Sequence, residues 1–228
     1  MSGIKYTKPA DIERASMRII REELAERGVT LAPEHEAVVL RAIHTTADFD
    51  YAETLTFTPG AVQTGMSALS AGADIVTDTN MAKAGISKAA LEKLGGGVYC
   101  YMADPNIAAA AKAEGVTRAA VSMRKAAEER PGAVFVIGNA PTAALELCTL
   151  IESGLRPPLI VGVPVGFVNV VESKERLLHT CRRCGIPAIV ALGRKGGSNV
   201  AAAICNALLY MATDAWNPAM DVPEGAVR

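Results

Sequence analysis

Short apolar runs alternate with amphipathic stretches along most of the chain. Five runs rich in Val, Ile and Ala predict buried strands at 74–79, 97–103, 133–138, 158–164 and 188–193. The stretches around them predict helices at 59–72, 85–94, 105–113, 117–130, 141–153, 169–184 and 198–213. Because strands and helices alternate, the pattern predicts an α/β fold in which helices cover both faces of a parallel sheet of about five strands.

The N-terminal region follows a different pattern. Residues 8–27 and 33–45 have helical spacing, and no strand is predicted in the first 50 residues. No linker or low-complexity segment separates this helical segment from the rest, so we expect one domain over 1–228. The Pro-rich tail at 214–228 is expected to pack loosely or to reach a partner subunit.

The composition and charge of the chain exclude several classes of function. The 228 residues are 50% hydrophobic and 21% charged, with a formal net charge of -1, as in globular proteins with a sizeable core. Without a long basic run, a nucleic-acid partner is not expected. Five cysteines form no even disulfide framework, and Cys181-x-x-Cys184 lacks the second pair of a zinc site. With no signal peptide or membrane span, we expect a cytoplasmic protein that binds a small molecule and no metal of its own.

Small and polar residues follow every predicted strand: TDTN, ADPN, GNAPT, GVPVGF and GRKGGSN. In a parallel sheet these loops share one edge, where the ligands of open α/β sheets bind. Glycine lets backbone N–H groups approach a ligand closely, which makes Gly138 and Asn139 candidate contacts. Short turns after strands use such residues in any case, but five together favour a ligand site.

The loop before the last helix is the strongest candidate for binding an anion. Arg194, Lys195, Gly196 and Gly197 would bring two cations, free N–H groups and a helix dipole to one place. A solvated basic turn is the alternative. The loop has no Walker A pattern, and no G-x-G-x-x-G follows a strand. Carboxylates therefore compete well with phosphates as ligands, and a nucleotide-dependent oxidoreductase is disfavoured.

His44 is the histidine best placed for chemistry. It ends the apolar run AVVLRAI and precedes TTAD, so it is expected to project where a helix meets a loop. An imidazole there exchanges a proton near neutral pH, although a packed or capping histidine fits the pattern as well. Arg41 lies three residues earlier, on the same helix face.

Two polar residues stand out on other predicted helices. Ser16 falls within the stripe formed by Ile12, Ile19, Ile20 and Leu24, where its hydroxyl needs its own i−4 carbonyl or a ligand as partner. Arg118 falls in the first turn of a helix, where a cation opposes the helix dipole. An anionic ligand or a surface salt bridge would explain that position.

Several long motifs, taken together, identify a family. They are IERASMRII, HTTADFDYAETLTFTPGAV, IVTDTNMAKAGI, VIGNAPTAALEL, VGVPVGFVNVVESKE and GRKGGSNVAAAICNAL. In this order, over nearly the whole chain, the sequence resembles the precorrin-8X methylmutase family, including its cobalt-precorrin-8 branch. The HTTAD form and the longer first helix resemble the cobalt branch slightly more.

The resemblance implies a three-layer α/β/α, flavodoxin-like domain that works as a homodimer in cobalamin biosynthesis. Family enzymes move a methyl group from C-11 to C-12 of a corrinoid, giving hydrogenobyrinate, or cobyrinate where the substrate carries cobalt. This isomerisation is assisted by protonation and needs no cofactor. The resemblance places the catalytic histidine on His44 and substrate contacts on Ser16, Ser87 and Arg118.

A macrocycle with acetate and propionate arms needs cations and N–H donors around a broad apolar cleft. The residues expected to supply them are Arg41, Lys83, Arg118, Arg194, Lys195 and the Gly196-Gly197 turn. The same cleft would suit a non-catalytic corrinoid carrier, which is the alternative function. The residues do not decide whether the natural substrate contains cobalt.

Overall fold

The computed structural model describes residues 8–214, so the tail expected at 214–228 lies, apart from Asp214, outside the described residues. Six strands form one sheet in the order β1-β6-β5-β4-β2-β3. Their bounds are β1 Leu55–Phe57, β2 Ile75–Thr77, β3 Val98–Tyr99, β4 Val134–Ile137, β5 Ile160–Gly162 and β6 Ala188–Ala191. Each of the five predicted strands is confirmed, in shorter form.

The strand order confirms the flavodoxin-like topology. Strands β2 to β6 run parallel, and numbered among themselves they follow the order 2-1-3-4-5. Strand β1 was not predicted. It pairs antiparallel to β6, with Leu55 opposite Ala191. Three residues directly after a helix are too short to show an alternating pattern, so the sheet holds six strands instead of about five.

Eleven helices complete the described part of the chain. Their bounds are α1 Pro9–Glu26, α2 Pro33–Thr46, α3 Tyr51–Thr54, α4 Ala61–Ser70, α5 Asn80–Gly85, α6 Lys88–Lys93, α7 Pro105–Glu114, α8 Arg118–Glu129, α9 Pro141–Glu152, α10 Val170–Cys184 and α11 Ser198–Ala212. The helix predicted at 85–94 is confirmed in shorter form as α6, whereas α5 was not predicted. Helix α6 begins at Lys88 because the hydroxyl of Ser87 caps it by accepting the N–H of Ala90 at 3.4 Å.

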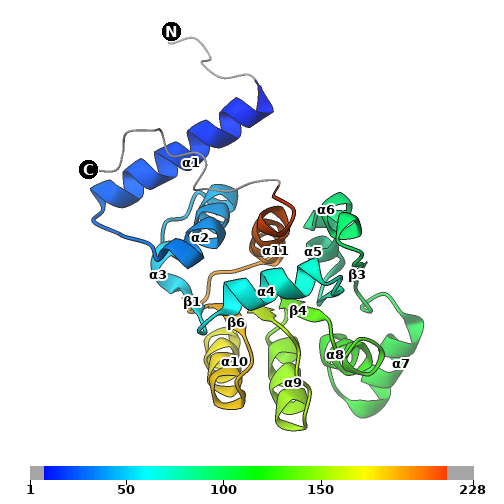
Figure 1. The fold of residues 1–228 in the computed structure, drawn as a ribbon. Coiled ribbons are helices and arrows are strands. Elements are labelled where there is room, and N and C mark those ends of the chain that lie inside the picture. Colours follow the sequence, from blue (N-terminus) through cyan, green and yellow to red (C-terminus); the bar gives the residue numbers. More distant parts are fainter. Residues whose placement is uncertain (1–7, 215–228) are drawn as a thin grey trace.

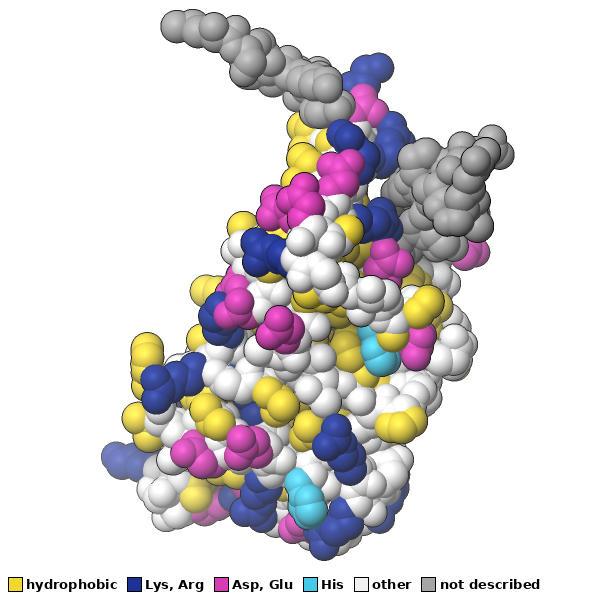
Figure 2. Space-filling view, turned by 90° about the vertical axis from the view of Figure 1, so that its left-hand side faces the viewer, with side chains coloured by type: hydrophobic (Ala, Val, Ile, Leu, Met, Phe, Trp, Pro, Cys, Tyr) yellow, Lys and Arg dark blue, Asp and Glu magenta, His cyan; other side chains and the backbone are white. Residues whose placement is uncertain are grey.

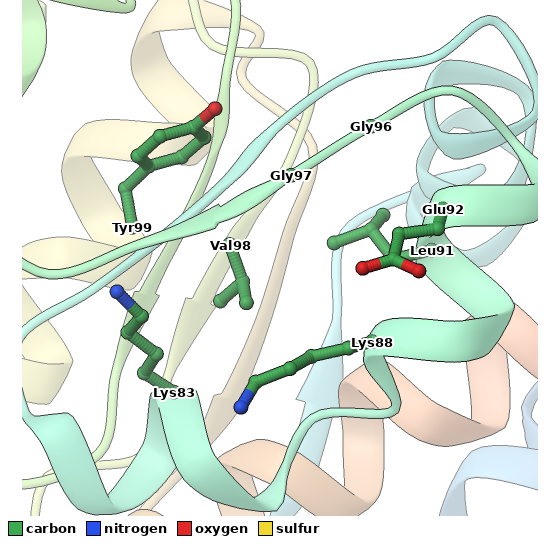
Figure 3. Close-up of a pocket in the computed structure, with 8 residues that line it drawn as sticks. All are labelled: Lys83, Lys88, Leu91, Glu92, Gly96, Gly97, Val98 and Tyr99. Atoms are coloured by element: carbon green, nitrogen blue, oxygen red, sulfur yellow. The ribbon is translucent and has the colours of Figure 1, made fainter.

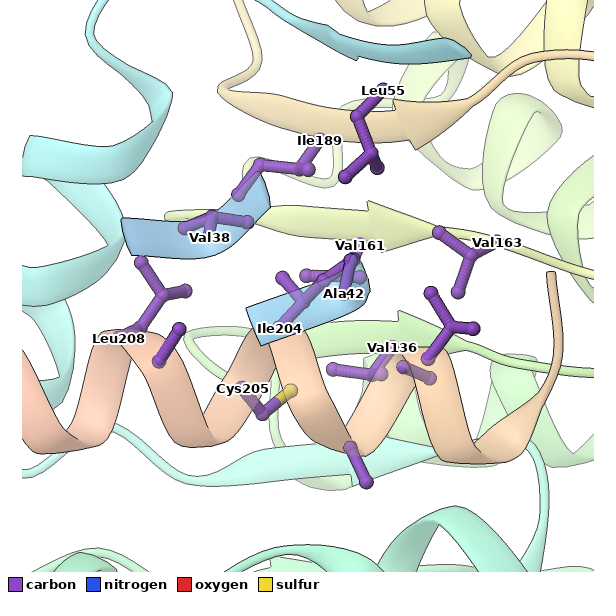
Figure 4. Packing of buried hydrophobic residues seen from close by; sticks show 14 of the residues in the cluster. Val38, Ala42, Leu55, Val136, Val161, Val163, Ile189, Ile204, Cys205 and Leu208 are labelled. Carbon is purple, nitrogen blue, oxygen red and sulfur yellow. The ribbon is translucent and has the colours of Figure 1, made fainter. Parts of the chain in front are cut away.

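Helices cover both faces of the sheet, as predicted. Figure 1 shows α2, α5, α6 and α11 on one face and α8, α9 and α10 on the other. Alternate strand residues therefore enter different cores. Val136 and Val161 pack towards α11 (Figure 4), whereas Phe135 and Ile137 belong to the core beneath α8, α9 and α10.

Helix α1 rests on α2 and projects beyond the body of the molecule (Figure 1). Its predicted apolar stripe is only half buried in the single chain. Ile20 and Leu24 are 8% and 4% exposed, but Ile12 and Ile19 are 46% and 47% exposed. Figure 2 shows apolar side chains among charged ones on this projecting part. The outer half of the stripe lacks a covering element among residues 8–214.

Candidate active site

The buried carboxylate of Asp78 joins two strands at the point where the sheet order reverses. Asp78 follows β2, and it accepts the backbone N–H groups of Gly138, Asn139 and Ala140, which follow β4, at 2.8, 2.9 and 2.7 Å. Burial raises the pKa of Asp78 above its usual value, although the three donors act in the opposite direction. The N–H groups of Gly138 and Asn139 are thus engaged within the protein.

Gly138 has a second structural role. A Cβ at this position would lie 2.9 Å from Cα of Ser198, at the start of α11. The hydroxyl of Ser198 in turn lies 2.8 Å from that of Thr79, which follows β2. The ends of β2 and β4 therefore lie close to the start of α11. Asn139, the predicted substrate contact next to Gly138, is exposed.

A groove with a volume of about 470 Å³ opens at the carboxyl edge of the sheet. The start of α8, the loop after β4 and the loop after β5 form its walls. Arg118 lines this groove and is exposed. Asn139 contributes from the loop after β4, so the structure brings these two predicted contacts together. An arginine beside an open groove provides the planar donor set that carboxylates bind.

The loop after β5 presents apolar side chains to solvent. Phe167, Val168 and Val165 are 84%, 77% and 42% exposed, and all three line the groove. The guanidinium carbon of Arg194 lies 5.7 Å from the centre of the Phe167 ring. A broad ligand with an apolar body and anionic arms matches this combination of surfaces. Phe167 was not predicted as a contact, although it ends the GVPVGF motif that follows a predicted strand.

The loop after β6 is tightly fitted against the loop after β5. The N–H of Gly197 donates to the carbonyl of Val163 at 2.9 Å. A Cβ on Gly196 would lie only 2.2 Å from the same carbonyl oxygen, so only glycine fits there. Lys195 Nζ is 2.6 Å from carboxylates of both Asp48 and Asp50. Hydrogen bonding to Lys195 lowers the pKa of Asp48 and joins this loop to the segment after α2.

His44 lies in the last turn of α2, near that junction, and is exposed. Neighbouring groups still remove part of its hydration, which lowers the pKa of His44; the charge of Arg41 lowers it further, and Glu13 opposes both effects. Arg41 Nη2 is 2.6 Å from Glu13 Oε1 on α1. A lowered pKa makes the imidazolium a stronger acid, which suits proton donation.

Three other predicted contacts lie away from the groove. The Ser16 hydroxyl donates to the carbonyl of Ile12 at 2.8 Å, the i−4 partner considered from sequence. Ser87 caps α6, and its N–H donates to Asn206 Oδ1 on α11 at 2.8 Å. Lys83 lines a separate hollow of about 290 Å³, where Figure 3 shows it with Lys88 beside Val98 at the edge of the sheet.

The predicted residues thus do not gather at one place. Ser16, Arg41 and His44 lie on α1 and α2, on the α11 side of the sheet, whereas Arg118 begins α8 on the opposite side. The loop with Arg194 and Lys195 lies between them at the carboxyl edge. A ligand that contacts both His44 and Arg118 must extend across this edge or be shared with another chain.

The fold and the groove define a flavodoxin-like α/β protein with an open, partly apolar groove at the carboxyl edge of the sheet and an exposed histidine, His44, at the end of α2. A family model described as precorrin-8X methylmutase matches residues 11–211. The chain belongs to the precorrin-8X methylmutase family, as its motifs predicted. Members are methylmutases, so the protein is an isomerase.

Individual relatives agree with this assignment. The chain is 46% identical to the cobalt-precorrin-8 methylmutase of Salmonella typhimurium, over 89% of this chain and 95% of that protein. It is 39% identical to the precorrin-8X methylmutase of Pseudomonas aeruginosa, over 86% and 93%. The crystal structure of the precorrin-8x methyl mutase from Thermus thermophilus superposes with a TM-score of 0.79 at 39% identity, covering 90% of this chain and 98% of that one.

Beyond the predicted residues, the structure adds two polar groups. Asp78 directly follows a buried strand, and its carboxylate needs donors once it is inside the protein. Lys174 occupies a position in the apolar stripe of α10, with Val170, Leu177 and Cys181 on the same face. A lysine at such a position is a sequence signal for a buried, hydrogen-bonded ammonium group.

Proposed function

We propose that this protein moves a methyl group from C-11 to C-12 of a precorrin-8-type corrinoid in cobalamin biosynthesis, giving hydrogenobyrinate or cobyrinate. The observation that carries the proposal is the 46% identity to a cobalt-precorrin-8 methylmutase over nearly the full length of both chains. The exposed histidine near the cationic edge of the sheet supports it.

His44 is the proton donor in this proposal. The methyl migration rearranges the conjugated system, and a proton delivered to the macrocycle stabilises the charge that develops in the transition state. The proton returns to His44 at the end, so no atom is gained or lost. Because its pKa is lowered, the imidazolium releases its proton readily. No methyl donor or redox cofactor takes part.

The carboxylate arms of the substrate are bound by the cations and N–H groups around the groove. Arg118 offers a guanidinium group and Phe167 an apolar surface in the groove, and the guanidinium group of Arg194 lies beside the Phe167 ring. On the α2 side, Arg41 lies one turn before His44, and Ser16 lies on α1, which packs on α2. The remaining proposed contacts are Lys83, Ser87, Gly138, Asn139, Lys195, Gly196 and Gly197.

The cobalt-containing corrinoid is the proposed natural substrate. The chain is 46% identical to a cobalt-precorrin-8 methylmutase and 39% identical to a precorrin-8X methylmutase. The metal would arrive in the substrate, held by the nitrogens of the macrocycle. Parallel assays with metal-free and cobalt-containing substrate test this preference through kcat/KM, and a higher value for the metal-free compound contradicts it.

We further propose a homodimer in the cytoplasm. Ile12 and Ile19 leave half of the α1 stripe exposed, and a second copy of the chain would bury it. The five cysteines are free thiols, as suits a reducing compartment. Sedimentation velocity tests the assembly: the protein should sediment as a dimer, and Ile19→Glu should shift it towards monomer. A monomeric wild-type protein contradicts the proposal.

The function is tested by the absorption spectrum of the corrinoid. Wild-type protein should change the spectrum of the precursor as the conjugation is rearranged. His44→Asn should keep binding the corrinoid while turnover falls by about 100-fold or more, and His179→Asn, which alters an exposed histidine on α10, should behave like wild type. Near-normal turnover in His44→Asn removes His44 from its role. A bound but chemically unchanged corrinoid in wild-type protein supports a carrier.

A further inference from the structure

Lys174 is a fully buried lysine behind the loop that follows β6. Its side chain is 0% exposed, and Nζ donates to the carbonyl oxygens of Gly193 at 2.9 Å and of Lys195 at 2.6 Å. No carboxylate within residues 8–214 forms a salt bridge with it. Burial lowers the pKa of Lys174 to about 8. Burying an ammonium group without a counter-ion costs free energy. A lysine at this position therefore indicates that its two hydrogen bonds have a role.

These two hydrogen bonds set the direction of two peptide groups. The peptide bonds of the described chain are trans, so each carbonyl points opposite to the N–H of the following residue. Because the carbonyls of Gly193 and Lys195 are directed towards Lys174, the N–H groups of Arg194 and Gly196 are directed away from Lys174. Neither N–H donates to an acceptor in the part of the chain that the structure describes.

Other contacts also attach this loop to the loop after β5. The carbonyl of Arg194 accepts the N–H of Gly166 at 3.4 Å, and Gly197 is bound to Val163. Gly196 is pressed against the loop after β5 so closely that a Cβ cannot be accommodated. Lys174 is therefore a further attachment of the loop, from the side of α10. Its positive charge also polarises the two peptide groups, which strengthens their N–H donors towards an anion.

We propose that Lys174 is a positioning residue that directs the N–H groups of Arg194 and Gly196 towards a carboxylate arm of the substrate. It does not contact the substrate itself, since the loop lies between them. The proposal rests on the proposed function for the kind of ligand, a macrocycle with carboxylate arms. The guanidinium group of Arg194 would contribute to the same anion site.

Kinetics separate this role from a purely structural one. In Lys174→Met the KM of the precursor and the Kd of hydrogenobyrinate should rise at least about tenfold, while kcat stays within about threefold, because the proton donor is untouched. Ser173→Ala is the matched control: it removes a buried hydroxyl on the same helix, bonded to Val170 at 2.9 Å, without touching the loop. It should leave KM and kcat unchanged. A folded Lys174→Met protein with wild-type KM overturns the proposal.

A second measurement needs no variant. In wild-type protein labelled with ¹⁵N, the amide signals of Arg194 and Gly196 should move downfield on addition of hydrogenobyrinate and should not move with its fully esterified form. Equal shifts with both probes, or none, overturn the proposal. If the signals move as expected but no substrate is converted, the proposed function fails and the carboxylate site at these two N–H groups stands. If the substrate is converted but these signals do not move, the proposed function stands and the proposed site at these N–H groups fails.

Discussion

The carboxylate of Asp78, at the end of β2, accepts the backbone N–H of Gly138 beyond β4 over 2.8 Å. The same carboxylate also accepts the N–H groups of Asn139 and Ala140. Chain connections lead away from β2 and β4 in opposite directions, and a crevice opens between such strands. The buried side chain of Asp78 therefore links the segments that follow β2 and β4 at the base of this crevice.

Replacing Asp78 by Ala should destabilise the protein strongly. Three backbone N–H groups would lose their acceptor, and each unsatisfied buried donor costs about 1–3 kcal/mol. We expect the free energy of unfolding in urea to fall by about 3 kcal/mol or more. Asp11→Asn, which alters an exposed pair with Arg14, should change it by less than about 0.5 kcal/mol. Similar small changes in both variants would show that the Asp78 contacts contribute little.

The sequence identified the carboxyl edge correctly for a physical reason. Buried strands of a parallel sheet are continuous apolar runs, so their ends are visible as an abrupt change to TDTN, GNAPT or GRKGGSN. Helix starts were also readable, because Pro105 and Pro141 fit only where an N–H is not needed.

Contacts between residues that are distant in sequence could not be predicted in the same way. Strand β1 exists because Leu55 reaches Ala191, and no local pattern encodes that contact. Lys195 was predicted as a contact for an anionic ligand, but the fold brings it to Asp48 and Asp50, which are distant in sequence. Lys174 was not predicted, because its carbonyl partners lie in the loop after β6, which is distant in sequence.

Gly196→Ala should weaken corrinoid binding. The new Cβ would lie 2.2 Å from the carbonyl oxygen of Val163 and 2.7 Å from that of Pro164, so the loop must move. We expect the Kd of hydrogenobyrinate, measured by calorimetry, to rise at least about tenfold. Gly132→Ala is the control, because a Cβ there meets nothing within 4 Å. Unchanged affinity in Gly196→Ala would mean that the loop does not contribute to the site.

Arg118→Gln should reduce affinity with little effect on stability. Arg118 is exposed at the start of α8, where it opposes the helix dipole, so its removal should leave the thermal midpoint within a few degrees of wild type. Loss of one charge-assisted pair with a carboxylate corresponds to a KM increase of about 10- to 100-fold. Arg118→Lys should recover only part of this, since lysine lacks bidentate geometry. Full recovery of KM in Arg118→Lys would show that a bidentate contact is not needed.

Lys174 should give the protein an unusual dependence of stability on pH. Its pKa is about 8 in the folded protein, whereas an unfolded lysine titrates near 10.4, so the unfolded chain binds more protons between these values. Stability therefore rises with pH across this window, by up to about 3 kcal/mol from this group. Urea titrations from pH 7.5 to 10.5 should show the wild type gaining stability relative to Lys174→Met. A difference in stability between the two proteins that stays constant with pH would mean that Lys174 has the same pKa in the folded and unfolded chain.

The acidity of His44 should respond in opposite directions to its two charged neighbours. Arg41 lowers the pKa of His44 and Glu13 raises it, so Arg41→Gln should raise this pKa and Glu13→Gln should lower it. Ring signals of His44 in the free protein, assigned by their loss in His44→Asn, report both shifts by NMR. If the imidazolium is the proton donor, the alkaline limb of the kcat profile should move up in pH in the first variant and down in the second. A kcat profile that stays in place while the NMR pKa moves would assign the limiting proton to another group.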